Sequence, residues 1–440
     1  MTSSKGDVAF KSPLRLGVAG LGTVGAGLAI LLRDNADIIT ARAGRPVEIT
    51  AVAARDRTRD RGIDLSHLTW HTNAADLAHD PNVDVVVELI GGAEGTARTL
   101  VEAALKAGKP VVTANKALLA IHGDTLARLS AEHNAPLLFE AAVAGGIPAI
   151  KTVREGLAPD RLLSVGGILN GTCNYILTAM RETGRDFADV LTEAQELGYA
   201  EADPSTDVDG IDAAHKLTIL ASLAFGNPVE FKSVHVEGIR SIGALDLSFA
   251  RTLGYRIKLL GLARRTEKGV EARVAPCLVP ETAPIAQVDG VFNAVIAEGT
   301  FVGRMMLEGR GAGAGPTATA VAADIIDVAR GNTVPVWGTD IRMLKAVASR
   351  PASEWRGAFY IRLTVADRTG VIADITAILR DCGVSLRSML QHPSVREGDD
   401  VPLVLMTHPT EESAMQAAVK RIAELNVVSA APVLIRIETF

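Results

Sequence analysis

The chain has 440 residues, enough for two or three domains that each bury a core. Its formal net charge of −6 provides no basic field for nucleic acid, and no apolar run is long enough to span a membrane. Three cysteines without CxxC spacing argue against a disulfide framework or a thiolate metal site. The polar first 13 residues lack the apolar segment of a signal peptide, so we expect a disordered lead-in and a cytoplasmic protein.

A glycine-rich turn follows the first predicted strand, residues 14–19. The turn reads Gly-Leu-Gly-Thr-Val-Gly and is followed by an apolar helical pattern, which is the context of a dinucleotide-binding fold. The first glycine permits the tight turn, the second lets the backbone approach a pyrophosphate, and the third lets the helix pack closely. The residues that we assign to the cofactor here are Gly20, Gly22, Thr23, Val24 and Gly25.

The end of the next predicted strand, residues 47–53, normally carries an acid that binds the ribose hydroxyls of NAD. This chain places Arg55 there, and a guanidinium suits a 2′-phosphate, which favours NADP over NAD. Asp56 keeps NAD open as an alternative, and Arg57 and Arg59 are also explained as surface charges.

A third buried strand, residues 84–90, ends at Gly91, where the inner half of the cofactor would pass. A helix over 96–107 and a strand over 110–113 lead to Lys116 at the carboxyl edge of the sheet. Lysine at the start of a helix opposes the helix dipole, which indicates a functional role for Lys116.

The turn from Glu140 to Pro148 offers one carboxylate and several backbone carbonyls, which together suit a hard cation. A plain interdomain loop is the alternative. Farther on, glycines crowd the segment 309–319 ahead of a helix predicted over 317–330, and this loop could close over a cofactor or act as a hinge. Predicted strands at 231–239, 256–263, 270–278 and 293–299 indicate an antiparallel or mixed sheet.

Residues 199–216 hold an unusual density of ionisable groups: Glu201, Asp203, Asp207, Asp209, Asp212 and Lys216. The apolar pattern after Gly210 predicts a helix, so Asp212 and Lys216 stand at i and i+4 on one face. A calcium loop fails because Lys216 takes the position that requires a bidentate glutamate. A solvated surface pair and a lysine poised to protonate an oxyanion both stay open.

These motifs together resemble homoserine dehydrogenase over about residues 14–345. The 198–216 motif is the most distinctive of them. The segments that carry the resemblance are Gly20–Gly25, Thr113–Lys116, Glu140–Pro148, Asn170–Thr172, Gly198–Lys216 and Gly311–Thr317.

The resemblance implies NAD(P)-dependent interconversion of L-homoserine and L-aspartate 4-semialdehyde, on the route to threonine, methionine and isoleucine. It makes Lys216 the proton donor, lets Lys116 bind and polarise the substrate, and places the amino-acid end on Glu201 and Asp212. Further substrate contacts fall on Asn170, Thr172, Gly198 and Asp207, and further cofactor contacts on Lys116 and Gly313. A monovalent cation, sodium or potassium, would be held at Glu140, Val143, Gly145 and Ile147.

The tail, predicted as strand–helix–strand–strand–helix–strand, resembles an ACT domain with its signature turn at residues 367–371. The resemblance implies threonine as an effector, while a purely structural dimerisation module is the alternative. We therefore expect an α/β protein with a Rossmann domain, an α+β substrate and dimerisation domain and a ferredoxin-like ACT domain, assembled as a homodimer or homotetramer. The expected boundaries are 1–13 lead-in, 14–140 Rossmann domain completed by about 305–345, 141–304 substrate domain, 346–357 linker and 358–440 ACT domain.

Three other functions need comparison. A phosphoglycerate dehydrogenase would not be expected to carry the 198–216 motif. A semialdehyde dehydrogenase needs a nucleophilic cysteine, for which Cys173 is the candidate. A catalytically inactive regulator that responds to NAD(P) and amino acids is disfavoured because both lysines and both acids are present. Since the first strand begins at residue 14, we expect no aspartate kinase segment.

Overall fold

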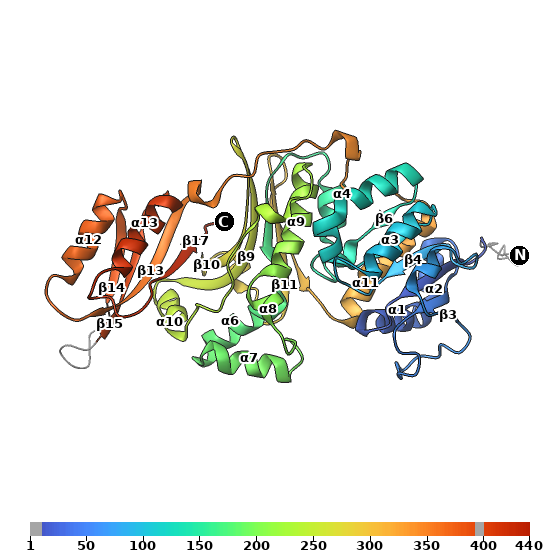
Figure 1. Ribbon diagram of the computed structural model, residues 1–440, viewed down its shortest axis with the longest axis horizontal. Coiled ribbons are helices and arrows are strands. Elements are labelled where there is room, and N and C mark those ends of the chain that lie inside the picture. The colour runs from blue at the N-terminus through green and yellow to red at the C-terminus, as the bar shows by residue number, and fades with distance from the viewer. Residues whose placement is uncertain (1–10, 392–399) are drawn as a thin grey trace, which may run out of the picture. The chain divides into compact units, whose positions relative to one another are not determined.

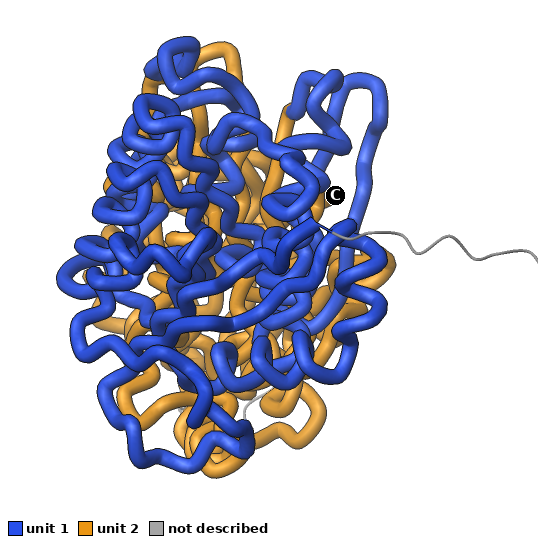
Figure 2. Tube along the Cα trace, turned by 90° about the vertical axis from the view of Figure 1, so that its right-hand side faces the viewer, with its two compact units in different colours: residues 1–162, 218–231, 297–346 blue, residues 163–217, 232–296, 347–440 orange. Residues whose placement is uncertain are grey.

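A computed structural model describes residues 11–391 and 400–440, so most of the predicted lead-in lies outside the described residues. The chain forms two compact units, which Figure 2 distinguishes by colour. Unit 1 comprises residues 1–162, 218–231 and 297–346, and unit 2 comprises residues 163–217, 232–296 and 347–440. The domain boundaries expected from the sequence remain a prediction.

Unit 1 contains a six-stranded, all-parallel sheet in the order β3-β2-β1-β4-β5-β6. The strand order reverses beside β1, and ligands of open α/β sheets bind at such a reversal, beyond the carboxyl ends of the strands. The strands are β1 (Leu14–Ala19), β2 (Val47–Ala53), β3 (Thr69–His71), β4 (Val85–Glu88), β5 (Val111–Thr113) and β6 (Leu137–Leu138).

Helices cover both faces of this sheet, because its central strands are apolar on both sides. Val85 and Val87 pack in the core beneath α1, α2 and α11, while Val86 points to the opposite face. Figure 1 shows α1 beside α11, which comes from far along the chain. The helices are α1 (Thr23–Asp34), α2 (Ala36–Ala43), α3 (Thr96–Lys106), α4 (Lys116–His133), α5 (Ala149–Lys151) and α11 (Ala314–Arg330), with shorter turns η1 (Ala74–Ala78), η2 (Glu140–Ala142), η3 (Thr152–Gly156) and η6 (Ile341–Met343).

Unit 2 is built on a mixed sheet in the order β11-β7-β9-β10-β17-β13-β15-β14. The long hairpin of β9 and β10 is antiparallel, whereas β10 pairs with β17 in parallel. The sheet that contains β9 and β10 therefore continues into the sheet of the tail. The strands are β7 (Leu162–Ile168), β8 (His235–Val236), β9 (Tyr255–Thr266), β10 (Gly269–Pro280), β11 (Phe292–Gly299), β13 (Arg356–Ala366), β14 (Leu386–Gln391), β15 (Asp400–Thr407), β16 (Thr410–Glu411) and β17 (Val433–Ile437).

The tail has the predicted βαββαβ order, with β13, α12, β14, β15, α13 and β17 around a core of its own. Its two helices bury an apolar stripe that includes Ile375 and Met415, while their charged faces meet solvent. The remaining helices of unit 2 are α6 (Gly171–Thr183), α7 (Phe187–Glu196), α8 (Ser205–Val208), α9 (Ile211–Phe225), α10 (Ala244–Thr252), α12 (Val371–Asp381) and α13 (Glu412–Ala423), with α9 ending in unit 1, and the turns η4 (Phe231–Ser233), η5 (Pro284–Gln287) and η7 (Ala352–Glu354).

Two sequence expectations were wrong in detail. The strand predicted over 231–239 is only β8, because a short helix η4 takes residues 231–233 and β8 meets β10 over two residues. The loop predicted over 309–319 is much shorter, since β12 (Gly303–Arg310) runs up to it and α11 already begins at Ala314. Pro316 did not prevent this earlier start, because the first turn of a helix tolerates proline.

Within the described ranges, no helix is long and apolar enough to cross a membrane.

Candidate active site

A pocket of about 660 Å³ lies at the carboxyl ends of the unit 1 strands. It is bordered by Gly20 and Gly22, and the space around these two glycines differs. A Cβ on Gly20 would lie 2.5 Å from the carbonyl of Leu89, and one on Gly25 would lie 2.1 Å from the carbonyl of Gly20. A Cβ on Gly22 would meet nothing within 4 Å. Gly20 and Gly25 are therefore required by packing, whereas Gly22 leaves open space for a ligand beside the start of α1.

Arginines border the same pocket: Arg55, Arg59 and Arg61. The carboxylate of Asp56 accepts hydrogen bonds from the amide and hydroxyl of Thr58, at 2.8 and 2.7 Å, and these bonds lower the pKa of Asp56. One oxygen of Asp56 is thus engaged by its own turn, while Asp56 lines the pocket together with the arginines.

Arg61 was not singled out by the sequence reasoning. Its guanidinium donates to the carbonyl of Leu21 at 3.0 Å and lies 5.8 Å from the centre of the Trp70 ring. Arg61 therefore both stabilises the wall of the pocket and adds a positive charge to it. The alternation of arginines at 55, 57, 59 and 61 was visible in the sequence, but nothing there distinguished Arg61 from its neighbours.

Lys116 is the first residue of α4 and is partly buried. Asn115 caps this helix by accepting from the amide of Leu118 at 3.1 Å. At the neighbouring strand end, Gly91 has φ 86°, in the left-handed region that favours glycine. The predicted cofactor residues Gly91 and Lys116 therefore lie at the ends of adjacent strands of one sheet.

In the turn after β6, the carboxylate of Glu140 has hydrogen-bond partners within the protein, whereas two backbone carbonyls have none. The buried carboxylate of Glu140 accepts from the amides of Ile150 and Lys151, at 2.9 and 2.8 Å, and burial together with Asp324 raises its pKa to about 7. Val143 and Gly145 are buried residues, and their carbonyls accept no hydrogen bond from any residue in 11–391 or 400–440. Such carbonyls are free to accept from or coordinate a ligand.

This turn also packs against the glycine-rich segment. A Cβ on Gly145 would lie 2.4 Å from the carbonyl of Gly311, and Gly146 donates to the carbonyl of Arg310 at 3.2 Å. Gly313, with φ 116°, then leads into α11. In the part of the chain that the structure describes, no group of three or more histidine, cysteine, aspartate or glutamate side chains could hold a metal ion.

Unit 2 brings several of the predicted substrate residues together. The ammonium of Lys216 donates to Asp212 at 2.8 Å and to the carbonyl of Leu169 at 2.7 Å. The amide of Asn170 donates to the same carboxylate oxygen of Asp212 at 2.8 Å and to Asp207 at 2.7 Å. Only 7% of Lys216 and 4% of Asp212 is exposed, so the solvated surface pair that the sequence left open is wrong.

Other predicted residues lie on the adjoining loop. Thr172 donates to the carbonyl of Tyr199 at 2.7 Å, and Gly198 makes the turn with φ 73°. Glu201 is exposed, and no hydrogen bond or ion pair joins its carboxylate to other described residues. Unit 2 by itself thus gathers Asn170, Asp207, Asp212 and Lys216 but not Glu201.

Cys173 follows Asn170 in α6 and is fully buried. Burial and the nearby carboxylate of Asp207 raise the pKa of its thiol well above the ordinary value. A nucleophilic cysteine needs the opposite shift, which counts against a semialdehyde dehydrogenase.

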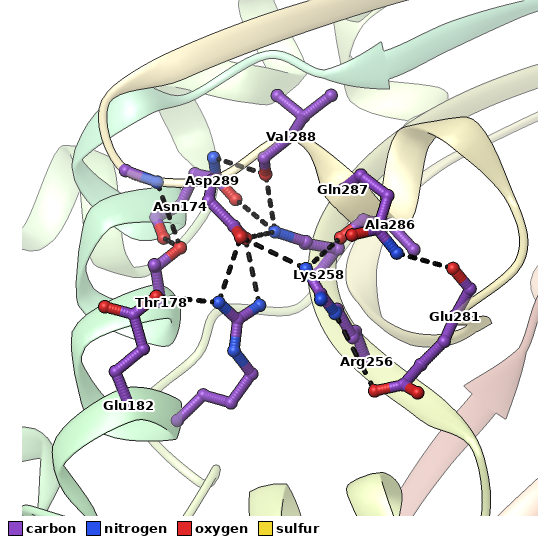
Figure 3. A network of polar contacts seen from close by, with 12 residues as sticks. Asn174, Thr178, Glu182, Arg256, Lys258, Glu281, Ala286, Gln287, Val288 and Asp289 are labelled. Atoms are coloured by element: carbon purple, nitrogen blue, oxygen red, sulfur yellow. Dashed lines mark hydrogen bonds and ion pairs between the residues drawn. The ribbon is translucent and has the colours of Figure 1, made fainter.

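A polar network anchors the far side of α6 (Figure 3). Buried Lys258 on β9 donates to Asn174, to the carbonyl of Val288 and to Asp289. Arg181 at the end of α6 forms a two-pronged ion pair with Asp289. The helix that begins at Asn170 is therefore fixed to β9 and to the loop before β11.

The glycine turn at a strand-order reversal, the arginine-lined pocket and the buried lysine–aspartate pair define an NAD(P)-dependent oxidoreductase that carries a tail of ACT topology. Family models match in the same order: "Homoserine dehydrogenase, NAD binding domain" at residues 20–140, "Homoserine dehydrogenase" at 148–326 and "ACT domain" at 359–427. The chain belongs to the homoserine dehydrogenase family.

Relatives support this over nearly the full length. Homoserine dehydrogenase of Pseudomonas aeruginosa is 46% identical over 97% of this chain and 99% of its own. The crystal structure of a homoserine dehydrogenase from Thiobacillus denitrificans aligns with a TM-score of 0.92 and 45% identity, covering 98% of this chain and all (100%) of that chain. A hyperthermophilic archaeal homoserine dehydrogenase in complex with NADPH aligns with a TM-score of 0.63 and 27% identity, covering 72% of this chain and 98% of that chain.

Proposed function

We propose that the chain reduces L-aspartate 4-semialdehyde to L-homoserine reversibly, with a nicotinamide cofactor as the hydride source. The observation that carries the proposal is the buried cluster of Lys216, Asp212 and Asn170, which keeps a charged lysine next to a carboxylate at the end of β7. Burying this many charges costs free energy, and a proton-transfer site accounts for the cost.

The chemistry assigns a role to each lysine. When hydride reaches the aldehyde carbon, negative charge develops on oxygen, and a positioned cationic acid stabilises it. Lys216 is the proton donor, and Asp212 keeps its ammonium oriented. Lys116 binds the substrate and polarises its carbonyl, while Glu201, Asn170, Thr172, Gly198 and Asp207 complete the substrate site.

NADP is the preferred cofactor in this proposal. The supporting feature is the charge along the pocket, where Arg55, Arg59 and Arg61 suit a 2′-phosphate. One oxygen of Asp56 accepts hydrogen bonds from its own turn, which leaves only the other for ribose hydroxyls. The remaining residues proposed to contact the cofactor are Gly20, Gly22, Thr23, Val24, Gly25, Gly91 and Gly313. The archaeal relative was solved with NADPH.

A monovalent cation, sodium or potassium, fits the turn from Glu140 to Ile147. The supporting feature is the pair of unbonded carbonyls of buried Val143 and Gly145, since oxygen donors suit hard cations. The carboxylate oxygens of Glu140 already accept from two amides, so its carbonyl and that of Ile147 are the other ligands.

Threonine is the proposed effector, bound by the ACT tail, in a cytoplasmic homodimer or homotetramer. The tail shares a continuous sheet with the substrate region through β10 and β17, which gives an effector a mechanical route to that region.

The test is absorbance at the nicotinamide band with L-aspartate 4-semialdehyde, NADPH or NADH, and sodium or potassium chloride against a bulky organic cation. We expect faster consumption of NADPH than of NADH, lower activity without the small cation, and slowing by threonine. Folded protein that consumes neither cofactor in either salt would favour the regulator instead.

A further inference from the structure

Glu88 is a buried acid for which the reaction gives no role. It ends β4 and is fully buried, with 0% exposed. Within the described residues no lysine, arginine or histidine forms an ion pair with it. A buried carboxylate without a cation must be stabilised by hydrogen bonds from neutral donors.

Those donors come from two different strand ends. One carboxylate oxygen of Glu88 accepts from the amides of Ile90 and Gly91, at 2.7 and 3.0 Å. The other accepts from the hydroxyl of Thr113 at the end of β5, at 2.5 Å. Glu88 therefore joins the turn after β4 to the end of the neighbouring strand.

The network continues to the residue before Lys116. The hydroxyl oxygen of Thr113 accepts from the amide of Asn115 at 3.0 Å, and the side chain of Asn115 donates to the carbonyl of Gly92 at 2.7 Å. The other end of that side chain caps α4. Asn115 therefore connects the turn after β4 to the first turn of α4, and Lys116 is the first residue of that helix.

We propose that Glu88 is a positioning residue for hydride transfer, which fixes Gly91 and Lys116 relative to each other. The inference rests on the proposed function, in which Gly91 borders the inner half of the cofactor and Lys116 polarises the substrate. Glu88 supplies two acceptor oxygens, one for the two amides of the turn after β4 and one for the hydroxyl of Thr113. A glutamine can keep its carbonyl oxygen on the two amides, but its NH₂ group then faces the hydroxyl of Thr113, whose proton loses its acceptor.

The test uses Glu88→Gln and Thr113→Val, with Thr113→Ser as the conservative variant. Glu48→Gln is the matched control, because Glu48 is exposed on β2 of the same sheet. We expect Glu88→Gln and Thr113→Val to lower kcat by about 10- to 100-fold, since small misplacements of reacting groups cost this much. Thr113→Ser retains the hydroxyl and should keep kcat within about threefold of the wild type.

Two further readouts separate positioning from mere stability. With NADPH deuterated at the transferred position, the isotope effect on kcat should rise in Glu88→Gln, because hydride transfer becomes slower relative to the other steps. The combined Glu88→Gln, Thr113→Val variant should lose little more than either single variant, because both break one unit. Lower thermal stability with unchanged kcat and isotope effect would overturn the proposal, as would a Thr113→Ser variant as slow as Thr113→Val.

A failure of the proposed function can be distinguished from a failure of the role proposed for Glu88. If the wild type does not reduce the aldehyde, that reaction is wrong, and titration of NADPH fluorescence still tests Glu88. Glu88→Gln should then bind NADPH about three- to tenfold more weakly than Glu48→Gln, because the Gly91 turn is loosened. Equal affinities would overturn the role of Glu88.

Discussion

Burial decides the meaning of the charged residues in this chain. The pair of Asp212 and Lys216 has the i, i+4 spacing of countless surface pairs, which contribute little to stability. Here both side chains are buried, and Asn170 adds a third group to the pair. A buried charge cluster of this kind is expensive and is typically retained for function.

Lys216→Ala is expected to lower kcat by about 10²- to 10⁴-fold, the usual contribution of general acid catalysis, with NADPH affinity nearly unchanged. Steady-state kinetics and NADPH fluorescence titration measure the two effects. Lys268→Ala, in the turn between β9 and β10, is the control for removing a lysine. Unchanged kcat in Lys216→Ala would remove this lysine from the mechanism.

Arg55→Ala tests the choice of cofactor. Removing one charge-assisted contact to a phosphate costs about 1.5–3 kcal/mol, so NADPH should bind about 10- to 100-fold more weakly while NADH is nearly unaffected. Titration of both cofactors measures this, with Arg33→Ala on the exposed face of α1 as the control. A parallel loss of NADPH and NADH affinity would contradict a role at the 2′-phosphate.

At the scale of elements, the clearest feature is the anchoring of α6. The helix carries Asn170 at its cap, and its other end is tied to Asp289 by Arg181. Burial would raise the pKa of Asp289, but the hydrogen bonds from Arg181 and Lys258 outweigh it and lower this pKa to about 2. The orientation of Asn170, and with it the cluster of Asn170, Asp212 and Lys216, therefore depends on the polar network around Asp289.

This network predicts an acid-sensitive element. The unfolded chain binds a proton at Asp289 near pH 3.9 and the folded chain only near pH 2, so its stabilising contribution is complete above about pH 4 and is lost as pH falls toward 2. Asp289→Asn should cost about 1–3 kcal/mol near neutral pH, because buried Lys258 loses its carboxylate but keeps Asn174 and the carbonyl of Val288. Its unfolding free energy should also fall less steeply than that of the wild type between about pH 4 and 2.

Urea unfolding monitored at several pH values measures both effects. Asp37→Asn, at an exposed site on α2, should follow the wild type throughout. A variant Asp289→Asn with the same pH dependence as the wild type would contradict the assignment of this carboxylate.

At the scale of the molecule, a part-buried ion pair joins the ACT tail to the rest of unit 2. Arg436 on β17 contacts Glu237 through two hydrogen bonds of 2.9 Å and also binds Glu412 at the start of α13. A Cβ on Gly238 would lie 2.2 Å from the carbonyl of Val208, next to Asp207 of the substrate cluster. The tail and that cluster are thus connected by contacts with little room to slide.

Glu237→Gln is expected to weaken regulation more than catalysis. If threonine binds the tail, the variant should need about fivefold more threonine for half inhibition, since coupling between sites is typically about 1–3 kcal/mol, while kcat without threonine stays within about twofold. Inhibition curves measure this, with Glu424→Gln at the exposed end of α13 as the control. If Glu237→Gln is inhibited by threonine as strongly as the wild type, the ion pair of Arg436 and Glu237 does not transmit the inhibition.

The sequence alone determined the features that depend on neighbours along the chain. The glycine turn between a strand and a helix, the i, i+4 pair at 212 and 216, and the βαββαβ order of the tail all follow from local periodicity and turn chemistry. The family resemblance rested on the same local motifs, and the comparisons confirmed it.

Only the tertiary structure decided which distant residues meet. Asn170 joins Asp212 from another element, Glu88 joins Thr113 across two strands, and Arg436 reaches Glu237 from the far end of the chain. The burial that distinguishes Lys216 from a surface lysine is also a property of the packed chain. Neither kind of contact leaves a periodic signal in the sequence, because each depends on how strands and helices align in space and not on spacing along the backbone.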